Sequence, residues 1–286
     1  MIAVVTINYR SEEKTIAFVR EEIPKIKSAR KVVVVNNAAT EESSRILREA
    51  LPDCLVVDSV ENLGFARGNN LGAETAKNDI FHGKISGKDF ILFVNNDIRF
   101  TSPDVVDALA SKLSELEDAA IIGPRIVGLD GKVQSPEPFQ PFMDRHFRLY
   151  WSTPFMSEEK HTRRFGLDYA EKAVEGYHYR VMGSIFLMKA RDFFDCGGMD
   201  PHTFLYCEEQ ILSERLKAIG KKVYYYPAVE VLHEHGTTTT KYFDKRKRRE
   251  MAFESERYYY ETYIGTPKWQ VALARVTYWL KRISGR

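Results

Sequence analysis

The sequence predicts an α/β fold built on a mostly parallel, doubly wound sheet. In the first third of the chain, segments rich in Val and Ile alternate with segments of helical character. The apolar runs are continuous, which is typical of parallel strands that helical crossovers cover on both faces. With 286 residues, 44% hydrophobic and 29% charged, the chain is long enough for one large globular domain or two small ones.

The first expected elements alternate regularly. Strands are expected at 2–7, 31–37, 54–59 and 90–96, and helices at 11–29, 41–51 and 64–76. A further helix is expected from Ser102 to about Glu117. Its start combines the capping hydroxyl of Ser102, Pro103 for the first turn, and Asp104 near the positive end of the helix dipole.

The pattern loosens after the apolar segment 119–127. Residues 131–176 combine turn residues, aromatics and charges, as in a long variable loop or lid. Regular structure is expected again at 179–190, in a helix at 208–219, and in two short strands at 222–227 and 229–233. We therefore divide the chain into an α/β half (1–125), a second half of the same domain (126–240) and a basic helical extension (241–286).

Composition limits the classes of partner and compartment. A net charge of +2, from 42 Lys and Arg against 40 Asp and Glu, gives no reason to expect a nucleic-acid partner. Cys54, Cys196 and Cys207 are too few and too scattered for a zinc cluster or a disulfide framework. The N-terminus lacks a basic leader, and no apolar run approaches the length of about 20 residues that spans a bilayer. We therefore expect a cytoplasmic protein.

Polar side chains collect where the expected parallel strands end. The first strand leads to Thr6 and Asn8, the second to Asn36 and Asn37, and the fourth to Asn95, Asn96 and Asp97. In open α/β sheets, ligands bind beyond the carboxyl ends of the strands. Short amide side chains can bond a nucleobase and a ribose without burying net charge, so a nucleotide site is predicted at this edge of the sheet.

Asp97 is the carboxylate in this set, and a diphosphate with a divalent cation requires one. Mn²⁺ or Mg²⁺ takes one or two protein oxygens and completes its shell with phosphates and water. The alternative is that residues 95–97 only form a turn, but three converging strand ends favour a ligand site. No Walker sequence and no G-x-G-x-x-G follows the first strand, so neither a P-loop nor a dinucleotide fold is supported.

Six segments occur in an order that resembles one enzyme family. They are VVTINYR, VVVVNNAAT, ENLGFARGNNLG, LFVNNDI, FLYCEEQILSERLKAIG and YYPAVEVLHEHGTTT. The series resembles the inverting nucleotide-sugar glycosyltransferases of family 2, which have the GT-A fold, and is similar to bacterial rhamnosyltransferase-like members. The resemblance implies an enzyme that transfers a sugar from a UDP- or dTDP-linked donor to a hydroxyl acceptor.

The resemblance also implies roles for the donor-side residues. Thr6 and Asn8 would line the base pocket. Asn36 stands where the family usually has an Asp that contacts the base, which leaves the base preference open because an amide donates as well as accepts. Gly64 and Arg67 would lie beside the nucleotide.

The ribose and metal positions follow from the same resemblance. Asn96 would face the ribose and Asp97 would bind the metal, while Asn95 replaces the first acid of the family's Asp-any-Asp motif. Two histidines spaced two residues apart on a strand face the same way, so His233 and His235 could hold a metal. The family often supplies a late His near the diphosphate, and His233 matches that position better than His235.

Glu208 and Glu209 open the helix expected at 208–219. Acids at a helix N-terminus interact favourably with the dipole, by ~0.3–1 kcal/mol each, so a structural role is one interpretation. In the family, the second acid of the pair at this site is the general base for the acceptor hydroxyl. The resemblance thus gives the base to Glu209 and acceptor orientation to Glu208. Gly183 lies in the segment that borders the acceptor site, and a glycine there indicates either the close approach of a ligand or a bulge in the strand.

The segment 266–286 predicts an amphipathic basic helix. Its apolar residues at helical spacing are Trp269, Leu273, Val276, Leu280 and Ile283, and no acid accompanies them. Such a helix lies on an anionic membrane surface, or it packs on its own domain or on another subunit. Because family members often act on lipid-linked acceptors, peripheral attachment to the inner face of the plasma membrane is one expectation.

The resulting hypothesis is a metal-dependent inverting glycosyltransferase. Its acceptor would be a glycan or lipid-linked glycan of a bacterial surface polysaccharide, such as capsule, O-antigen or exopolysaccharide. One rival, a sugar nucleotidyltransferase, would need a Gly- and Lys/Arg-rich phosphate loop after the first strand, which NYRSEEKT matches poorly. The other rival is a nucleotide-sugar-binding module with a decayed site. Asn36 and Asn95 fit this second rival, whereas Asp97, Glu209 and His233 do not.

Overall fold

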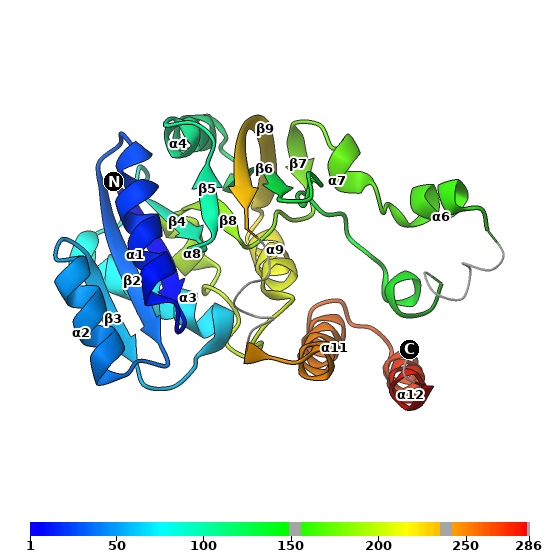
Figure 1. Ribbon diagram of the computed structural model, residues 1–286. Coiled ribbons are helices and arrows are strands. Elements are labelled where there is room, and N and C mark those ends of the chain that lie inside the picture. Colours follow the sequence, from blue (N-terminus) through cyan, green and yellow to red (C-terminus); the bar gives the residue numbers. More distant parts are fainter. Residues whose placement is uncertain (149–155, 235–241, 285–286) are drawn as a thin grey trace.

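Nine strands form one mixed sheet in the computed structural model, which describes residues 1–148, 156–234 and 242–284 (Figure 1). Hydrogen-bonded neighbours follow the order β3-β2-β1-β4-β8-β6-β9-β5, and β7 pairs with β9. The first four strands of this order are parallel to one another: β1 (Ile2–Asn8), β2 (Arg30–Asn37), β3 (Leu55–Ser59) and β4 (Phe90–Val94).

β8 (Ile185–Lys189) reverses the direction of the sheet. It runs antiparallel to β4 and to β6 (Ala119–Gly128), and β6 is parallel to β9 (Lys222–His233). The short strands β5 (Ile98–Phe100) and β7 (Gly176–His178) are antiparallel neighbours of β9. Because residue 125 falls within β6, the two halves proposed from the sequence share one sheet.

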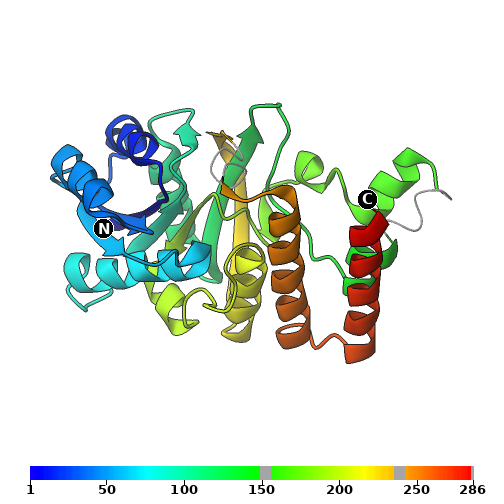
Figure 2. The ribbon, with the colours of Figure 1, turned by 60° about the horizontal axis from the view of Figure 1, so that its bottom comes forward.

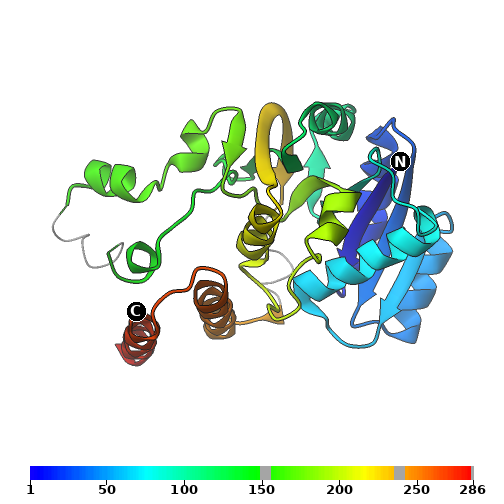
Figure 3. The same ribbon diagram turned by 180° about the vertical axis from the view of Figure 1, so that it is seen from behind.

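Helices cover both faces of this sheet, which confirms the doubly wound α/β prediction (Figures 1 and 3). One face carries α1 (Glu12–Glu21), α2 (Glu41–Ala50) and α4 (Val105–Glu115); the other carries α3 (Gly64–Thr75), α8 (Ala190–Asp195) and α9 (Glu208–Ala218). Val4 of β1 belongs to the first apolar core and Val5 to the second, as the alternation of side chains along a strand requires.

Three predicted boundaries were wrong. α1 ends at Glu21 instead of residue 29, and the turn after it contains Pro24, which cannot continue a helix because it lacks an amide proton. The expected cap at Ser102 does not form, since α4 begins only after Asp104, and Asp104 pairs with Lys27. The two strands expected at 222–233 are the single strand β9.

The segment 131–176 is partly helical and not a loop throughout. α6 (Glu158–Phe165) begins after Ser157, whose hydroxyl accepts a hydrogen bond from the Lys160 amide, and α7 (Tyr169–Lys172) follows it. The α6 sequence EEKHTRRF has no apolar stripe, so periodicity did not predict this helix.

The described part of the C-terminal extension is a hairpin of two helices, α11 (Lys245–Thr262) and α12 (Lys268–Ser284), which lie side by side in Figure 2. Tyr259 and Tyr260 of α11 form an apolar cluster with Ile211 of α9, and Val271 and Ala274 of α12 join it. The extension therefore packs on its own domain, which was one of the expected alternatives.

Three residues of the predicted apolar stripe of α12 are exposed, and the side chains of the other two, Leu280 and Ile283, lie outside the described part of the structure. Trp269, Leu273 and Val276 are 63%, 45% and 54% exposed. None of the described helices is both long and apolar enough to cross a membrane.

Asp200 joins the hairpin to the sheet domain. Its buried carboxylate accepts hydrogen bonds from the hydroxyls of Tyr258 and Tyr263, and it lies 3.2 Å from the Arg215 guanidinium of α9. The His202 ring nitrogen Nδ1 lies 2.7 Å from the same carboxylate. Burial alone would raise the pKa of Asp200, but these donors outweigh it and lower the pKa to about 2.

We expect Asp200→Asn to lower the free energy of unfolding by about 3–5 kcal/mol at pH 7, the usual cost of breaking a buried charge pair. The pKa of an unfolded Asp is about 3.9, so the contribution of Asp200 is complete above that pH and is lost as the pH falls toward 2. Urea unfolding of wild type and Asp200→Asn at pH 7 and pH 3 measures this change in the free energy of unfolding. Asp195→Asn, on the exposed end of α8, is the control. Equal stability of both variants at pH 7 would contradict the role of Asp200.

Candidate active site

A cleft of about 750 Å³ opens at the carboxyl ends of β1, β2 and β4. Its lining comprises Ile7, Tyr9, Ser11, Asn37, Asn62, Gly64, Phe65, Asn95, Asn96, Asp97, Phe204, Leu205 and Phe243. The location is the one expected for ligands of an open α/β sheet. Six of the lining side chains carry an amide or a hydroxyl, and Asp97 adds a carboxylate to the lining.

Residues 95–97 form a turn and also line the cleft, so the two interpretations of this segment are compatible. The Ile98 amide bonds the Asn95 carbonyl across the turn at 3.3 Å. The backbone amide of Asn95 donates to the Ser184 carbonyl at 2.8 Å, which connects the turn to the segment before β8. The Asn96 side chain donates to the hydroxyls of Ser11 and Thr15, at 3.1 and 2.8 Å.

Asp97 and His233, the two residues to which the resemblance gives the metal, lie next to each other at this turn. β5 pairs with the end of β9 so that Ile98 lies opposite His233. The His233 Nε2 is 3.4 Å from the Asp97 Oδ1, and that buried oxygen accepts no hydrogen bond from the described residues. Neighbouring ligands of an octahedral Mg²⁺ lie about 3 Å apart, so the pair fits two sites of a divalent cation.

The protein part of such a site is small. No cluster of three or more His, Cys, Asp or Glu side chains with the geometry for a metal occurs among the residues that the structure describes. Two protein ligands leave the remaining positions to phosphate oxygens and water, which is the usual arrangement for Mg²⁺ bound with a nucleotide. His235 lies outside the described residues.

Thr6, Asn8 and Asn36 are buried behind the cleft instead of lining it. The side-chain amide of Asn8 donates to the Asn36 Oδ1 at 3.0 Å, and the side-chain amide of Asn36 donates to the Asp58 carboxylate at 2.9 Å. Because successive side chains of a strand point to opposite faces, their neighbours Ile7, Tyr9 and Asn37 line the cleft.

Asn37, Asn62 and Gly64 line the cleft beside the N-terminus of α3. The Asn37 Oδ1 accepts from the Leu63 amide at 2.7 Å, and the Asn62 Oδ1 accepts from the Gly64 amide at 3.1 Å. Gly64 has a φ of 72°, and a β-carbon there would lie 2.2 Å from the Phe204 carbonyl oxygen. This position therefore requires glycine for both conformation and space.

Arg67, by contrast, is not part of the cleft lining. Its exposed side chain lies 3.5 Å from Glu61. Of the two residues expected beside the nucleotide, Gly64 lines the cleft and Arg67 does not. Sequence reasoning missed the lining residues Asn62, Phe204 and Phe243, whose position depends on contacts between distant segments.

Glu209 is held in place by the segment before β8. Its Oε1 accepts the Gly183 amide at 2.8 Å, and its Oε2 lies 3.9 Å from the Arg180 guanidinium. A β-carbon at Gly183 would lie 2.5 Å from this Oε1, so the glycine permits a close approach. The neighbour is Glu209 itself, and β8 begins only after Gly183, so this glycine is not a bulge within the strand.

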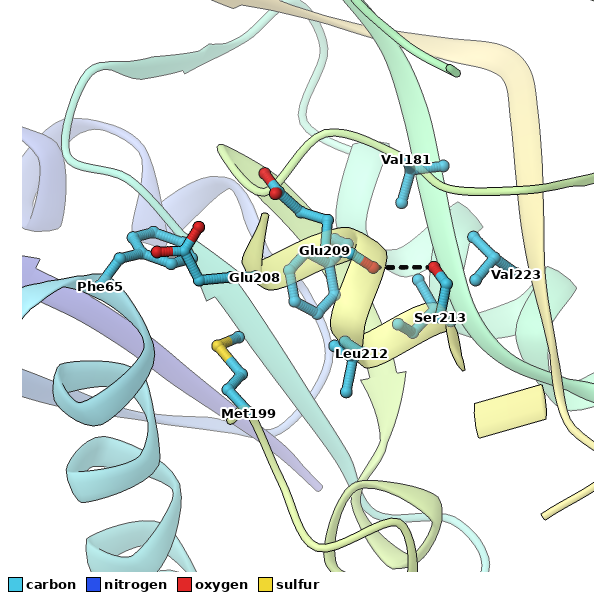
Figure 4. A pocket seen from close by; sticks show the side chains of 10 residues that line it. Phe65, Val181, Met199, Glu208, Glu209, Leu212, Ser213 and Val223 are labelled. Carbon is cyan, nitrogen blue, oxygen red and sulfur yellow. Dashed lines mark hydrogen bonds between the residues drawn. The ribbon is translucent and has the colours of Figure 1, made fainter. Parts of the chain in front are cut away.

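Glu208 points in a different direction from Glu209 (Figure 4). It extends toward Phe65 and Met199 in a largely apolar pocket, where it is only 4% exposed and its Oε1 has no hydrogen-bond partner among the described residues. Burial raises the pKa of the Glu208 carboxyl, and the neighbouring Glu209 raises it further. The two acids therefore differ: the buried Glu208 favours the protonated form, whereas Glu209 contacts the Gly183 amide and the Arg180 guanidinium.

We expect Glu208→Gln to become more stable relative to wild type as the pH rises from 5 to 8. The raised pKa means that the folded protein retains a proton which the unfolded chain loses above about pH 4.3, so this residue costs wild type up to about 1.4 kcal/mol per pH unit until the folded pKa is reached. Glutamine removes that cost without changing the shape. Urea unfolding at pH 5 and pH 8 measures it.

Glu41→Gln is the matched control, because Glu41 is also the first residue of a helix but is exposed. A stability difference between Glu208→Gln and wild type that stays constant with pH would show that Glu208 is already ionised in the fold.

Comparisons with known proteins place this geometry in a family. The sequence model named "Glycosyl transferase family 2" matches residues 2–181. The N-acetylglucosaminyl-diphospho-decaprenol L-rhamnosyltransferase of Mycobacterium tuberculosis is 25% identical over 209 residues, which cover 73% of this chain and 67% of that protein.

Two solved structures share the fold. The mannosyltransferase PcManGT from Pyrobaculum calidifontis, in complex with GDP-Man and Mn²⁺, aligns with a TM-score of 0.56 and 12% identity over 100% of this chain and 76% of its own. S. aureus TarS 1–349 in complex with UDP aligns with a TM-score of 0.54 and 12% identity, over 93% of this chain and 73% of its own. The family model covers well over half of the sequence, and the chain belongs to glycosyl transferase family 2, as a glycosyltransferase with the GT-A fold.

Proposed function

We propose that the protein transfers a sugar, with inversion, from a nucleoside diphosphate to a hydroxyl of a glycan or lipid-linked glycan, in a metal-dependent reaction. One observation carries the proposal: two hydrogen bonds link the turn at 95–97, which holds the proposed cation ligand Asp97, to the candidate base Glu209. The Asn95 amide bonds the Ser184 carbonyl, and the adjacent Gly183 amide bonds Glu209. The segment 183–184 thus links the turn that holds Asp97 to the acid of α9 through hydrogen bonds.

The candidate site residues have complementary tasks. Glu209 would take the proton of the acceptor hydroxyl as that oxygen attacks the anomeric carbon. Asp97 and His233 would hold Mn²⁺ or Mg²⁺, which when bound neutralises charge on the departing diphosphate. Asn37 and Asn62 would offer polar groups to the nucleotide, and Tyr9 an aromatic ring. The neutral form of Glu208 would leave Glu209 as the charged member of the pair.

The relatives support the substrate classes. The name of the M. tuberculosis relative specifies L-rhamnose and a diphospho-decaprenol-linked N-acetylglucosamine, and the titles of the structural neighbours contain GDP-Man, UDP and Mn²⁺. We propose a UDP- or dTDP-linked hexose or deoxyhexose as donor, and a surface-polysaccharide intermediate as acceptor. Family membership sets aside the nucleotidyltransferase alternative, and the intact Asp97, His233 and Glu209 oppose a decayed binding module.

Calorimetric titration with UDP, dTDP and GDP, with and without Mn²⁺, tests the donor site. We expect one nucleotide to bind wild type only with the metal, and Asp97→Asn to weaken that binding at least tenfold because a cation ligand is lost. Glu209→Gln should bind the same nucleotide as tightly as wild type, yet lower the rate of nucleoside diphosphate release from the matching nucleotide sugar by ~10²–10⁴-fold. Equal binding by wild type and Asp97→Asn would refute the metal site, and undiminished turnover in Glu209→Gln would refute the base.

We also propose that α12 rests on an anionic membrane surface, where a lipid-linked acceptor would be found. Its outward face carries the exposed Trp269 and Val276, and residues 266–286 contain Lys and Arg but no acid. Apolar side chains beside basic ones are the composition that binds anionic bilayers.

Flotation with vesicles of phosphatidylcholine, with and without phosphatidylglycerol, measures this attachment. We expect wild type to float only with the anionic vesicles, and Trp269→Ser/Val276→Ser to lose most of that binding. Val60→Ser/Leu129→Ser is the control, because these residues are 86% and 76% exposed but lie elsewhere. Equal flotation of the two double variants would exclude α12 as the membrane-binding surface.

A further inference from the structure

A second pocket, of about 410 Å³, lies beside the candidate base where four distant segments meet. These segments are 137–145, 179–180, 207–210 and 256–260, so α11 of the C-terminal extension forms part of the wall. Arg180 connects the pocket to the candidate base, because it belongs to the lining and its guanidinium lies 3.9 Å from the Glu209 Oε2. A molecule in this pocket would therefore be next to the acid to which we give the proton transfer.

The charged side chains that line this pocket balance one another. Arg180 forms an ion pair with Glu137, and the Arg145 guanidinium lies 2.7 Å from the Glu256 carboxylate. The other lining residues are uncharged at pH 7, since burial raises the pKa of the Cys207 thiol and of the three lining tyrosines. Two cations thus accompany two anions, and the pocket has no excess charge that would favour a phosphate or a carboxylate.

Gln210, which follows Glu209 on α9, adds an unpaired acceptor to this lining. Its side-chain Oε1 is buried and accepts no hydrogen bond within the described part of the chain. An unpaired buried acceptor costs free energy, so such an oxygen indicates a partner that binds from outside the fold. An amide side chain both donates and accepts, which suits the hydroxyl or acetamido groups of a sugar. The alternative is that the pocket is only a packing gap between α11 and the sheet domain.

We propose that this pocket is the acceptor subsite, that it takes an uncharged sugar unit, and that Gln210 helps to determine which sugar binds. The inference rests on the proposed function, because it takes Glu209 as the base. One hydroxyl of the bound sugar would give its proton to Glu209 while its oxygen bonds the anomeric carbon of the donor, and the bond from that carbon to the diphosphate breaks. Because Glu256, Tyr259 and Tyr260 belong to α11, the C-terminal extension would take part in acceptor selection.

Saturation-transfer difference NMR titrations with methyl glycosides test this subsite. The panel comprises the methyl glycosides of glucose, galactose, mannose, rhamnose, N-acetylglucosamine and N-acetylgalactosamine, measured with UDP, dTDP or GDP and Mn²⁺ in excess. We expect wild type to bind at least one glycoside, and Gln210→Leu to bind it about tenfold more weakly because a hydrogen bond is lost. Gln270→Leu is the matched control and should bind like wild type, since Gln270 is also a partly buried glutamine on a helix but lies outside the pocket lining.

Two further measurements separate sugar recognition from packing. Gln210→Leu removes an unpaired buried oxygen, so urea unfolding should show that this variant is at least as stable as wild type. Excess inorganic phosphate should not displace the glycoside, because the pocket has no excess positive charge. Lower stability of Gln210→Leu would show that the amide already serves the fold, and displacement by phosphate would reveal an anion site. Either result would overturn the proposal.

These measurements involve no sugar transfer, so their outcome is independent of the proposed reaction. If no glycoside of the panel binds wild type, or if wild type and Gln210→Leu bind equally well, the subsite is wrong even where Glu209→Gln has lost turnover. If Glu209→Gln keeps full turnover while Gln210→Leu has lost glycoside binding, the choice of the base is wrong and the sugar subsite stands.

Discussion

The antiparallel pairing of β4 with β8 is the constraint on which the site depends. It sets the carboxyl end of β4 beside the start of β8, so that Asn95 bonds Ser184 and the adjacent Gly183 bonds Glu209. The cation-side turn and the acid of α9 are thereby fixed relative to each other, although more than a hundred residues separate them in sequence. A slip in this register would separate Asp97 from Glu209, and with them the two halves of the proposed reaction centre.

The first half of the fold could be predicted from local pattern, because the continuous apolar runs of β1 to β4 indicate strands covered on both faces. In the second half, α9 and β9 could also be predicted from local pattern, but the pairing of the strands and the short elements could not. The direction of β8 depends on which distant strands it pairs with, β5 and β7 have three residues each, and α6 has no apolar stripe. The GT-A architecture came from the resemblance, which carries long-range information that local periodicity lacks.

The sequence predicted which segments lie at the cleft, but not always which of their side chains face it. Asn95, Asn96 and Asp97 line the cleft, and His233 lies beside Asp97. The roles given to these residues and to Glu209 stay predictions. Asn8 lies one residue from the cleft-lining Tyr9, and a strand interior gives no local sign of which neighbour faces a ligand. The pocket at Gln210 is formed by four distant segments, and no spacing rule connects them.

The close approach of Glu209 to Gly183 has an evolutionary consequence. A side chain at position 183 would collide with the carboxylate of a residue as long as Glu. An Asp at position 209, which the family usually has at this place, would withdraw the carboxylate by about one carbon–carbon bond, ~1.5 Å, and open that space. Positions 183 and 209 should therefore covary among homologues, with glycine favoured at 183 where the longer acid is present and larger residues more frequent where the acid is short.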